Sequence, residues 1–141
     1  MCRSDPLVVA GMKRRKAGTV PAIRRECDQL WSRAVHERAG DRCELCGGNP
    51  HSAHHIFTRG SSLATRWDLD NGICLCIRCH YAVHSGNLST EYQALIRDVV
   101  GDDRFERIRR KHRTKVTLRK ADFEQIRDGL RQATGTFAEM C

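Results

Sequence analysis

The side chains best suited to metal chemistry lie in one stretch of this sequence, residues 43 to 84. Its four paired cysteines form two C-x-x-C units, Cys43 with Cys46 and Cys76 with Cys79. Thiolates are soft ligands, and two such pairs supply the four sulfurs of a closed tetrahedral zinc site. The paired spacing beside histidines favours metal binding over a disulfide framework. We therefore predict that these four cysteines hold one structural Zn²⁺ ion.

A second group of ligand-forming side chains lies among and after the cysteine pairs. His80 and His84 are four residues apart, so on a helix both imidazoles project from one face and can bind one ion. His54, on a strand facing that helix, would supply a third nitrogen and leave positions for water and a phosphate oxygen. These three histidines are the predicted ligands of a catalytic divalent ion.

His55 and Asn71 complete this second group without binding the ion. An imidazole with the ordinary pKa of about 6.5 is neutral at pH 7 and can accept a proton, so His55 is the predicted general base. Asn71 has both a donor and an acceptor, and we predict that it joins the loop to the strand and orients His55. A plain Asn-Gly turn is the alternative for Asn71. Adjacent strand residues normally point to opposite faces, so His54 and His55 can share a site only where the strand twists or ends.

The order of these residues resembles the HNH (ββα-metal) endonuclease family, in which a His-His pair, an Asn and a later His appear in that order. The layout after the His-His pair, including the helical tail, is more loosely similar to phage recombination nucleases of the NinG type. The resemblance implies that His54 and His55 face one site, and that Asn71 orients the loop or binds metal. The matching residues are 53–56, 70–73 and 75–80, with His84 one helical turn later.

This resemblance implies an enzyme that hydrolyses phosphodiester bonds in DNA. His55 would activate water, and the ion would stabilise charge on the phosphate and the departing oxygen. Many relatives have Asp where this chain has His54, so Mg, Mn, Zn and Ni all stay open as the catalytic metal. Arg59, Arg66 and Arg78 are predicted phosphate contacts, which add affinity but little sequence information. Duplex, nicking and branched-DNA substrates stay open, and cutting both strands would favour a homodimer.

The charge balance supports a polyanionic partner. The 141 residues carry a formal net charge of +8, with a pI of about 9.4, which favours nucleic acid. No apolar run reaches the ~18 residues of a membrane-spanning helix, so we expect no membrane partner. Metal-type cysteine spacing indicates a reducing compartment, and with the phage-type resemblance we expect the cytoplasm of a bacterium or a phage-infected host.

The helices and strands expected around these residues indicate an α+β, mostly helical fold. The expected fold has a ββα-metal core, a pair of zinc knuckles with four cysteines in total, and flanking helices. We expect a flexible basic arm at residues 1–20, the nuclease core with its leading helix at 21–88, and a helical extension at 89–141. The segment 57–69 is expected to be a loop, and Asn71-Gly72 a tight turn. Strands are expected at residues 52–57 and 73–75, and helices at 21–39, from 76 to 84 or 85, from 89 or 90 to 100, from 102 or 103 onward, and at 120–133.

Two interpretations without catalysis compete with the nuclease. One is a zinc-dependent nucleic-acid-binding module that does not cut, which the set of histidines and Asn71 disfavours. The other is a zinc-finger adaptor for protein partners, which the +8 charge disfavours. A binding module would be indifferent to His55→Ala, whereas a nuclease would keep its DNA affinity and lose cutting.

Overall fold

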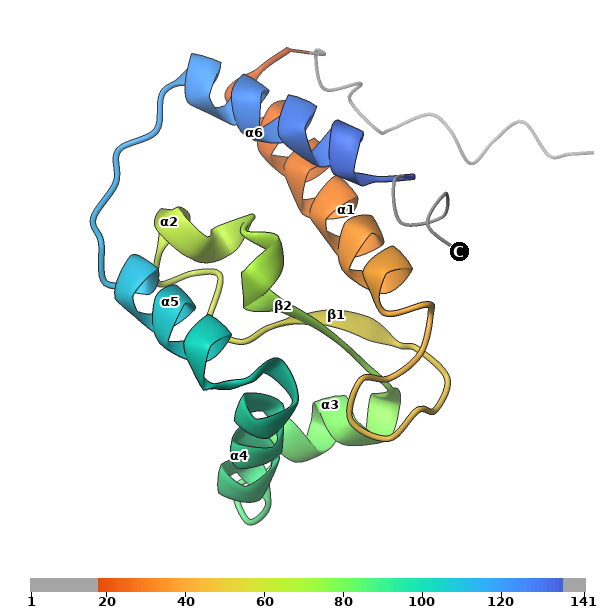
Figure 1. The fold of residues 1–141 in the computed structure, drawn as a ribbon. Coiled ribbons are helices and arrows are strands. Elements are labelled where there is room, and N and C mark those ends of the chain that lie inside the picture. The colour runs from red at the N-terminus through yellow and green to blue at the C-terminus, as the bar shows by residue number, and fades with distance from the viewer. Residues whose placement is uncertain (1–17, 136–141) are drawn as a thin grey trace, which may run out of the picture.

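The computed structural model describes residues 18–135 and has the mostly helical α+β architecture expected from the sequence (Figure 1). Its sheet in this part of the chain is one antiparallel pair of short strands. The arm predicted for residues 1–20 lies almost entirely outside the described residues. No helix between residues 18 and 135 is long and apolar enough to cross a membrane. In chain order the elements are α1 (Val20–Arg38), β1 (Ser52–His55), α2 (Leu63–Arg66), the 3-10 helix η2 (Leu69–Asn71), β2 (Gly72–Leu75), α3 (Ile77–His84), α4 (Ser89–Val100), α5 (Asp102–His112) and α6 (Lys120–Ala133).

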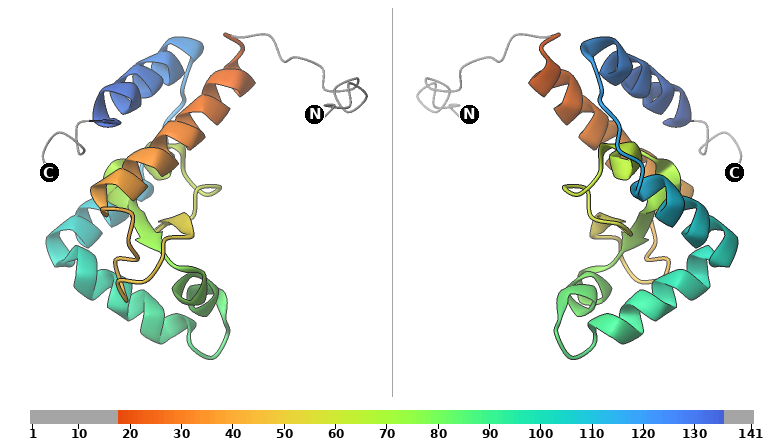
Figure 2. Two further views of the ribbon diagram at one scale, coloured as in Figure 1. Left: turned by 90° about the vertical axis from the view of Figure 1, so that its right-hand side faces the viewer. Right: turned by 90° about the vertical axis from the view of Figure 1, so that its left-hand side faces the viewer.

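Helix α1 builds one of two hydrophobic cores. Pro21 suits its first turn, where an N–H would have no partner within the helix. Ile23, Cys27 and Trp31 recur at helical spacing and are buried. This stripe packs against α6, where Phe123 is also buried, and the two helices lie side by side at one end of the molecule (Figures 1 and 2). The apolar face predicted for residues 21–39 therefore forms and faces the core.

Helices α3 and α4 build the second core at the other end of the molecule (Figure 2). Cys76 is the residue before α3, and its sulfur accepts a hydrogen bond from the Cys79 N–H. Val83 of α3 and Ile96 of α4 are both buried in this core. The start of α3 is thus fixed by a cysteine of the predicted zinc site.

Strands β1 and β2 separate the two cores. His54 pairs with Ile73 and His55 pairs with Gly72, and paired residues lie on the same face of a sheet. Ile73 belongs to the core of α3 and α4, whereas its neighbour Cys74 belongs to the core of α1. The first of the two adjacent histidines therefore faces α3, and the second faces α1.

The connection between the strands is not the tight turn predicted from Asn71-Gly72. Strand β1 ends at His55, earlier than expected, and the connection contains α2 and η2. Gly72 has extended geometry, with φ −109° and ψ 141°. A Cβ on this glycine would lie only 2.4 Å from Val35 Cγ2 and 2.8 Å from Trp31 Cζ2. The glycine is therefore needed for close packing against α1, and the prediction of a turn was wrong.

The basic helix α5 is held against this connection by its charges. Arg107 pairs with Asp70 at 2.6 Å, and Lys111 pairs with Asp68. The partly buried guanidinium of Arg104 donates a hydrogen bond of 2.9 Å to the backbone oxygen of Asp70. Arg107 and Lys111 thus stay exposed but have carboxylate partners on this connection, and Arg104 is held by the backbone of the connection.

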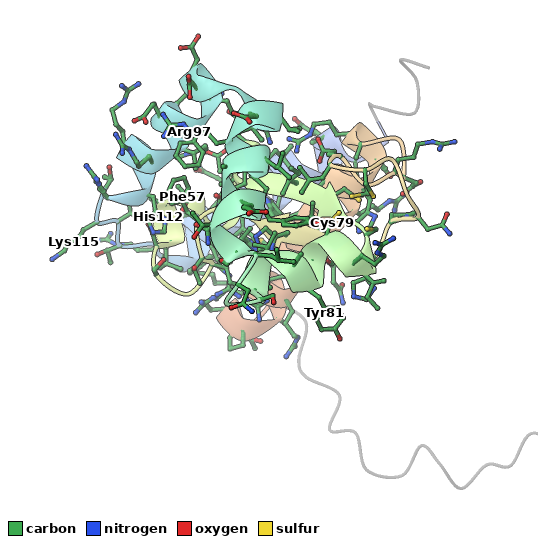
Figure 3. The ribbon with its side chains drawn as sticks, turned by 90° about the horizontal axis from the view of Figure 1, so that it is seen from below. Phe57, Cys79, Tyr81, Arg97, His112 and Lys115 are labelled. Carbon is green, nitrogen blue, oxygen red and sulfur yellow. The ribbon has the colours of Figure 1, made fainter. Side chains whose placement is uncertain are left out.

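His112, at the end of α5, ties this helix to the loop after β1. Its two ring nitrogens lie 2.9 Å from the hydroxyl oxygens of Ser61 and Thr65. Its ring also lies against Phe57, with centroids 5.2 Å apart, and the two are neighbours in Figure 3. Helix α5 thus helps to fix the loop that follows the two adjacent histidines.

Candidate metal centres

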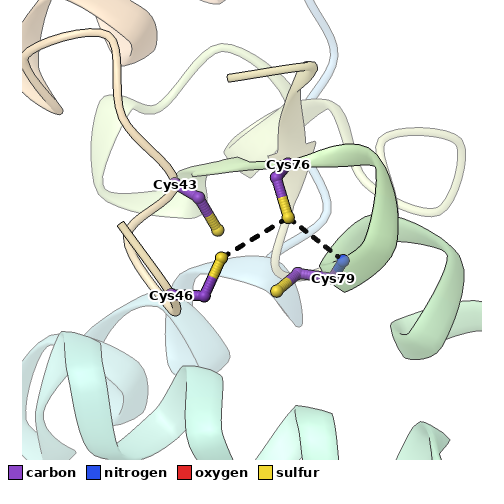
Figure 4. A group of neighbouring side chains, drawn as sticks. All are labelled: Cys43, Cys46, Cys76 and Cys79. Atoms are coloured by element: carbon purple, nitrogen blue, oxygen red, sulfur yellow. Dashed lines mark hydrogen bonds between the residues drawn. The ribbon is translucent and has the colours of Figure 1, made fainter. Parts of the chain in front are cut away.

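The four cysteines of the two C-x-x-C pairs converge on one point (Figure 4). Their sulfur atoms all lie within 4.8 Å of one another, and Cys46 Sγ is 3.6 Å from Cys76 Sγ. Four Zn–S bonds of about 2.3 Å in a tetrahedron place sulfurs about 3.8 Å apart, so this cluster can bind a metal ion such as zinc. Cys43, Cys76 and Cys79 are buried, and Cys46 is exposed.

Local backbone geometry brings the sulfurs together. The first pair lies in a turn in which Gly47, with φ +73°, donates its N–H to the Cys43 oxygen at 2.8 Å. In the second pair the Cys79 N–H points at Cys76 Sγ, 3.4 Å away. This hydrogen bond is the main reason that the pKa of Cys76 is lowered to about 7. A readily formed thiolate is the state that binds a metal ion.

Three histidines form a second cluster, with nitrogen atoms also within 4.8 Å of one another. His54 reaches it from β1, while His80 and His84 occupy successive turns of α3 and lie 5.0 Å apart, centroid to centroid. The His54 ring is 5.5 Å from that of His80 and 5.3 Å from that of His84. The predicted grouping of these three side chains is therefore present, because the face of β1 that carries His54 packs against α3.

The surroundings of His54 and His80 favour the neutral form of these two imidazoles. Burial, followed by the nearby His80 and His84, lowers the pKa of His54 to about 4. Burial, followed by His84 and His51, also lowers the pKa of His80. A neutral imidazole has a lone pair on its unprotonated nitrogen, and this neutral form is the one that binds a metal. His84 is exposed, so a metal ion on the cluster would be reachable from solvent.

His55 lies on the other face of β1 and is held in one orientation. Its ring stacks on Trp31, with centroids 3.8 Å apart and planes 12° from parallel. Its Nε2 is 2.8 Å from the backbone oxygen of Arg66. Since a carbonyl oxygen can only accept, Nε2 carries the proton and Nδ1 has the lone pair. Burial lowers the pKa of His55 more than the Arg66 carbonyl raises it, which favours the neutral ring.

Both adjacent histidines open into one hollow of about 490 Å³, here called the first hollow. The two side chains leave β1 on opposite faces, but the strand ends at His55 and the hollow extends along both sides of that end. The first hollow is lined by Asp28, Trp31, Ser32, Ala53, His54, His55, Thr58, Arg59, His80 and His84.

Asn71 is fully buried and does not line this hollow. Its Oδ1 accepts the Phe57 N–H at 2.8 Å, and its Nδ2 donates to the oxygens of Phe57 and Thr65 at 3.0 and 3.1 Å. Thr65 precedes Arg66, whose oxygen holds His55. The end of α2, where backbone oxygens lack partners within the helix, therefore anchors both Asn71 and His55. This geometry has the form of the predicted link between loop and strand.

The three arginines predicted to contact DNA lie in different surroundings. Arg66 donates to both carboxylate oxygens of Asp28, at 3.1 and 2.9 Å, so its guanidinium already has an anionic partner. Burial raises the pKa of Asp28, but hydrogen bonds from Arg66 and Trp67 outweigh it, and the net shift is downward. Arg59 is exposed at the first hollow, and Arg78 is exposed on α3. Arg66 is thus tied to α1 through Asp28, and its role as a phosphate contact stays a prediction.

Comparisons with family models, curated proteins and solved structures found no match to this chain. Function is therefore inferred from the chain's own geometry. That geometry combines a closed cluster of four sulfurs, an accessible cluster of three imidazoles, and a fourth imidazole with a defined free nitrogen.

Proposed function

We propose that this chain is a metal-dependent DNA endonuclease of the HNH (ββα-metal) type. One observation carries the proposal: His55, with its lone pair on Nδ1, opens into the same hollow as His54, His80 and His84. A general base and an accessible metal-binding cluster in one cavity are the two parts that metal-assisted hydrolysis needs.

The four-cysteine cluster has a different role in this proposal. It binds a structural Zn²⁺ ion that joins the turn after α1 to the start of α3. Four sulfur ligands close a tetrahedral site and leave no position for substrate. The cluster therefore fixes the position of α3, and with it the positions of His80 and His84, without taking part in the reaction.

The side chains of the first hollow have different roles in the proposed reaction. A divalent ion held by the three imidazoles would supply positive charge to the phosphate as negative charge develops on its oxygens. Arg59, exposed at the same hollow, would contact a phosphate of the DNA backbone. His55 Nδ1 would accept a proton from the attacking water. Trp31 and the Arg66 oxygen keep the imidazole in position and fix its tautomer.

Electrostatics support a nucleic acid as the substrate. The whole chain has a net charge of +8, and such a surface attracts a polyanion at long range. Arg78 is exposed on α3 and makes no hydrogen bond with the described residues, so its charge is available to DNA. These contacts are expected to give affinity without sequence preference.

The test is cleavage of a supercoiled plasmid and of a four-way junction, with Mg, Mn, Ni and Zn added separately. We expect the wild type to cut at least one of these DNAs, and His55→Ala to cut about 100-fold more slowly or not at all, with similar DNA affinity. His36→Ala is the matched control, because His36 does not line the first hollow. Binding by wild type and mutant without cutting in any metal would instead favour a non-catalytic zinc-dependent nucleic-acid-binding module.

A further inference from the structure

A second hollow, of about 560 Å³, adjoins the candidate metal site. It shares His54, His55, Thr58 and His84 with the first hollow, so the two cavities meet at the histidine cluster. Its remaining walls come from α3, α4, α5 and the loop after β1. The part of the second hollow that lies beyond these shared residues has no role in the reaction proposed above.

One wall of this second hollow is aromatic. Phe57 lies 5.2 Å from Phe105 and 5.2 Å from His112, centroid to centroid. The His112 ring is in turn held by Ser61 and Thr65 through both nitrogens. Figure 3 shows Phe57, His112 and Arg97 together on one side of the molecule. The wall is therefore already in place before any ligand binds.

The charges that line this hollow are already neutralised. Its one Lys or Arg side chain is Arg97, which donates to Asp102 at 2.8 Å and to Glu106 at 3.2 Å. The Arg97 guanidinium also lies over the Phe105 ring, 4.8 Å from its centroid. The first hollow, by contrast, has the exposed Arg59. A phosphate therefore suits the first hollow, and an uncharged aromatic group suits the second.

Few side chains of the second hollow have free hydrogen-bonding groups that could distinguish one aromatic ligand from another. Gln93 Nε2 donates a hydrogen bond to Ser89 Oγ at 2.9 Å. Its amide oxygen has no hydrogen-bond partner among the described residues and can accept one from a ligand. Both nitrogens of His112 are already used. Recognition here would depend mainly on stacking and apolar contact, which tolerate any base.

We propose that the second hollow binds an unpaired nucleobase next to the phosphate in the first hollow. This inference rests on the proposed function, and it specifies the substrate as DNA with an unpaired nucleotide beside the cleaved bond. Proteins bind such bases on aromatic side chains once the bases leave the helical stack. A bulge, a flap or a branch point exposes the base at little energetic cost, whereas a paired base must first be pulled out of the duplex.

The test measures binding without the catalytic metal, so that it is independent of cleavage. The probes are a duplex with one bulged nucleotide, the same duplex with an abasic bulge, and the fully paired duplex. We expect the wild type to bind the base-containing bulge roughly tenfold more tightly than either other DNA. The abasic bulge matters because it is flexible but has no base to insert.

Two variants test whether the preference for the base-containing bulge arises in the second hollow. Ala94→Trp would fill the hollow from an exposed position on α4, and we expect it to remove the preference without changing the affinity for paired DNA. Leu95→Trp, at the exposed neighbouring position outside the hollow, should keep the preference. Equal wild-type affinity for all three DNAs, or an unchanged preference in Ala94→Trp, would overturn the inference.

The same DNAs separate this inference from the proposed function. If the wild type cuts all three equally, the base pocket is wrong and the nuclease assignment stands. If it prefers the base-containing bulge but cuts nothing with any metal, the pocket stands and the nuclease assignment is wrong.

Discussion

Trp31 lies flat against His55, with ring centroids 3.8 Å apart, although the two residues belong to different elements. The contact requires Gly72, because any Cβ there would occupy the space taken by Trp31. Trp31 Nε1 also donates to the Asp68 oxygen at 2.9 Å, which fixes the indole ring in its own plane. The position of the proposed general base thus depends on close packing between α1 and β2.

Gly72→Ala is expected to disturb that packing. A methyl group 2.4 Å from Val35 and 2.8 Å from Trp31 forces one of them to move, at a cost of about 1–3 kcal/mol in the free energy of unfolding. Because Trp31 supports His55, we expect cleavage to fall by more than DNA affinity does. Urea unfolding and single-turnover cleavage measure the two effects.

Gly129→Ala is the control for this substitution. Gly129 lies in the body of α6, and a Cβ added to it would meet nothing within 4 Å, so alanine should stabilise the helix by about 0.5–1 kcal/mol. If both substitutions changed stability alike, the close approach at Gly72 would not be the cause.

Replacement by Gln should affect DNA binding at Arg59 and stability at Arg66. Arg59→Gln removes an exposed charge at the first hollow, so DNA affinity and its salt dependence should fall, with the salt slope smaller by about one unit. Arg66→Gln breaks the two hydrogen bonds to Asp28, so we expect a loss of stability. Fluorescence anisotropy at several salt concentrations, together with thermal unfolding, measures both. Arg66→Gln with native stability and weaker DNA binding would instead support Arg66 as a DNA contact.

We expect the cysteines of the four-cysteine cluster to bind zinc and Cys74 not to bind it. Cys43→Ser removes one of four sulfurs, and we expect loss of bound zinc and a fall of at least about 10 °C in the unfolding temperature. Cys74→Ala should keep the zinc, because Cys74 lies in the other core and burial raises the pKa of its thiol to about 11. Metal analysis and calorimetry on both variants provide the measurement. Zinc retained by Cys43→Ser, or lost by Cys74→Ala, would contradict this division.

Most of the four-cysteine and three-histidine clusters could be predicted from the spacing of residues that are close in the sequence. The C-x-x-C pairs form turns that bring their own sulfurs together, and His80 and His84 share a helix face whatever the rest of the fold does. The apolar face of α1 was readable for the same reason. In each case the interaction that forms the feature acts between residues a few positions apart.

Contacts between distant segments could not be read in this way. Arg66 looked like a free cation, because its partner Asp28 is 38 positions away on α1. Gly72 looked like a turn residue, because the requirement on it comes from Trp31 and Val35. No signal in the sequence linked His112 to Ser61 and Thr65, since those hydrogen bonds exist only once α5 packs on the loop.

The most direct test of the account is the metal dependence of cleavage while the four-cysteine site stays filled. Wild type and His84→Ala would be stripped of weakly bound ions, assayed for zinc, and then titrated with Mn²⁺ on a supercoiled plasmid. His84 is exposed at the end of α3, so its loss should leave the fold and the zinc intact. We predict one zinc ion per chain in both proteins, with Mn²⁺-dependent cutting by the wild type and cutting at least about 100-fold slower by His84→Ala. Equal cutting by the two zinc-loaded proteins would contradict a catalytic ion at the histidine cluster.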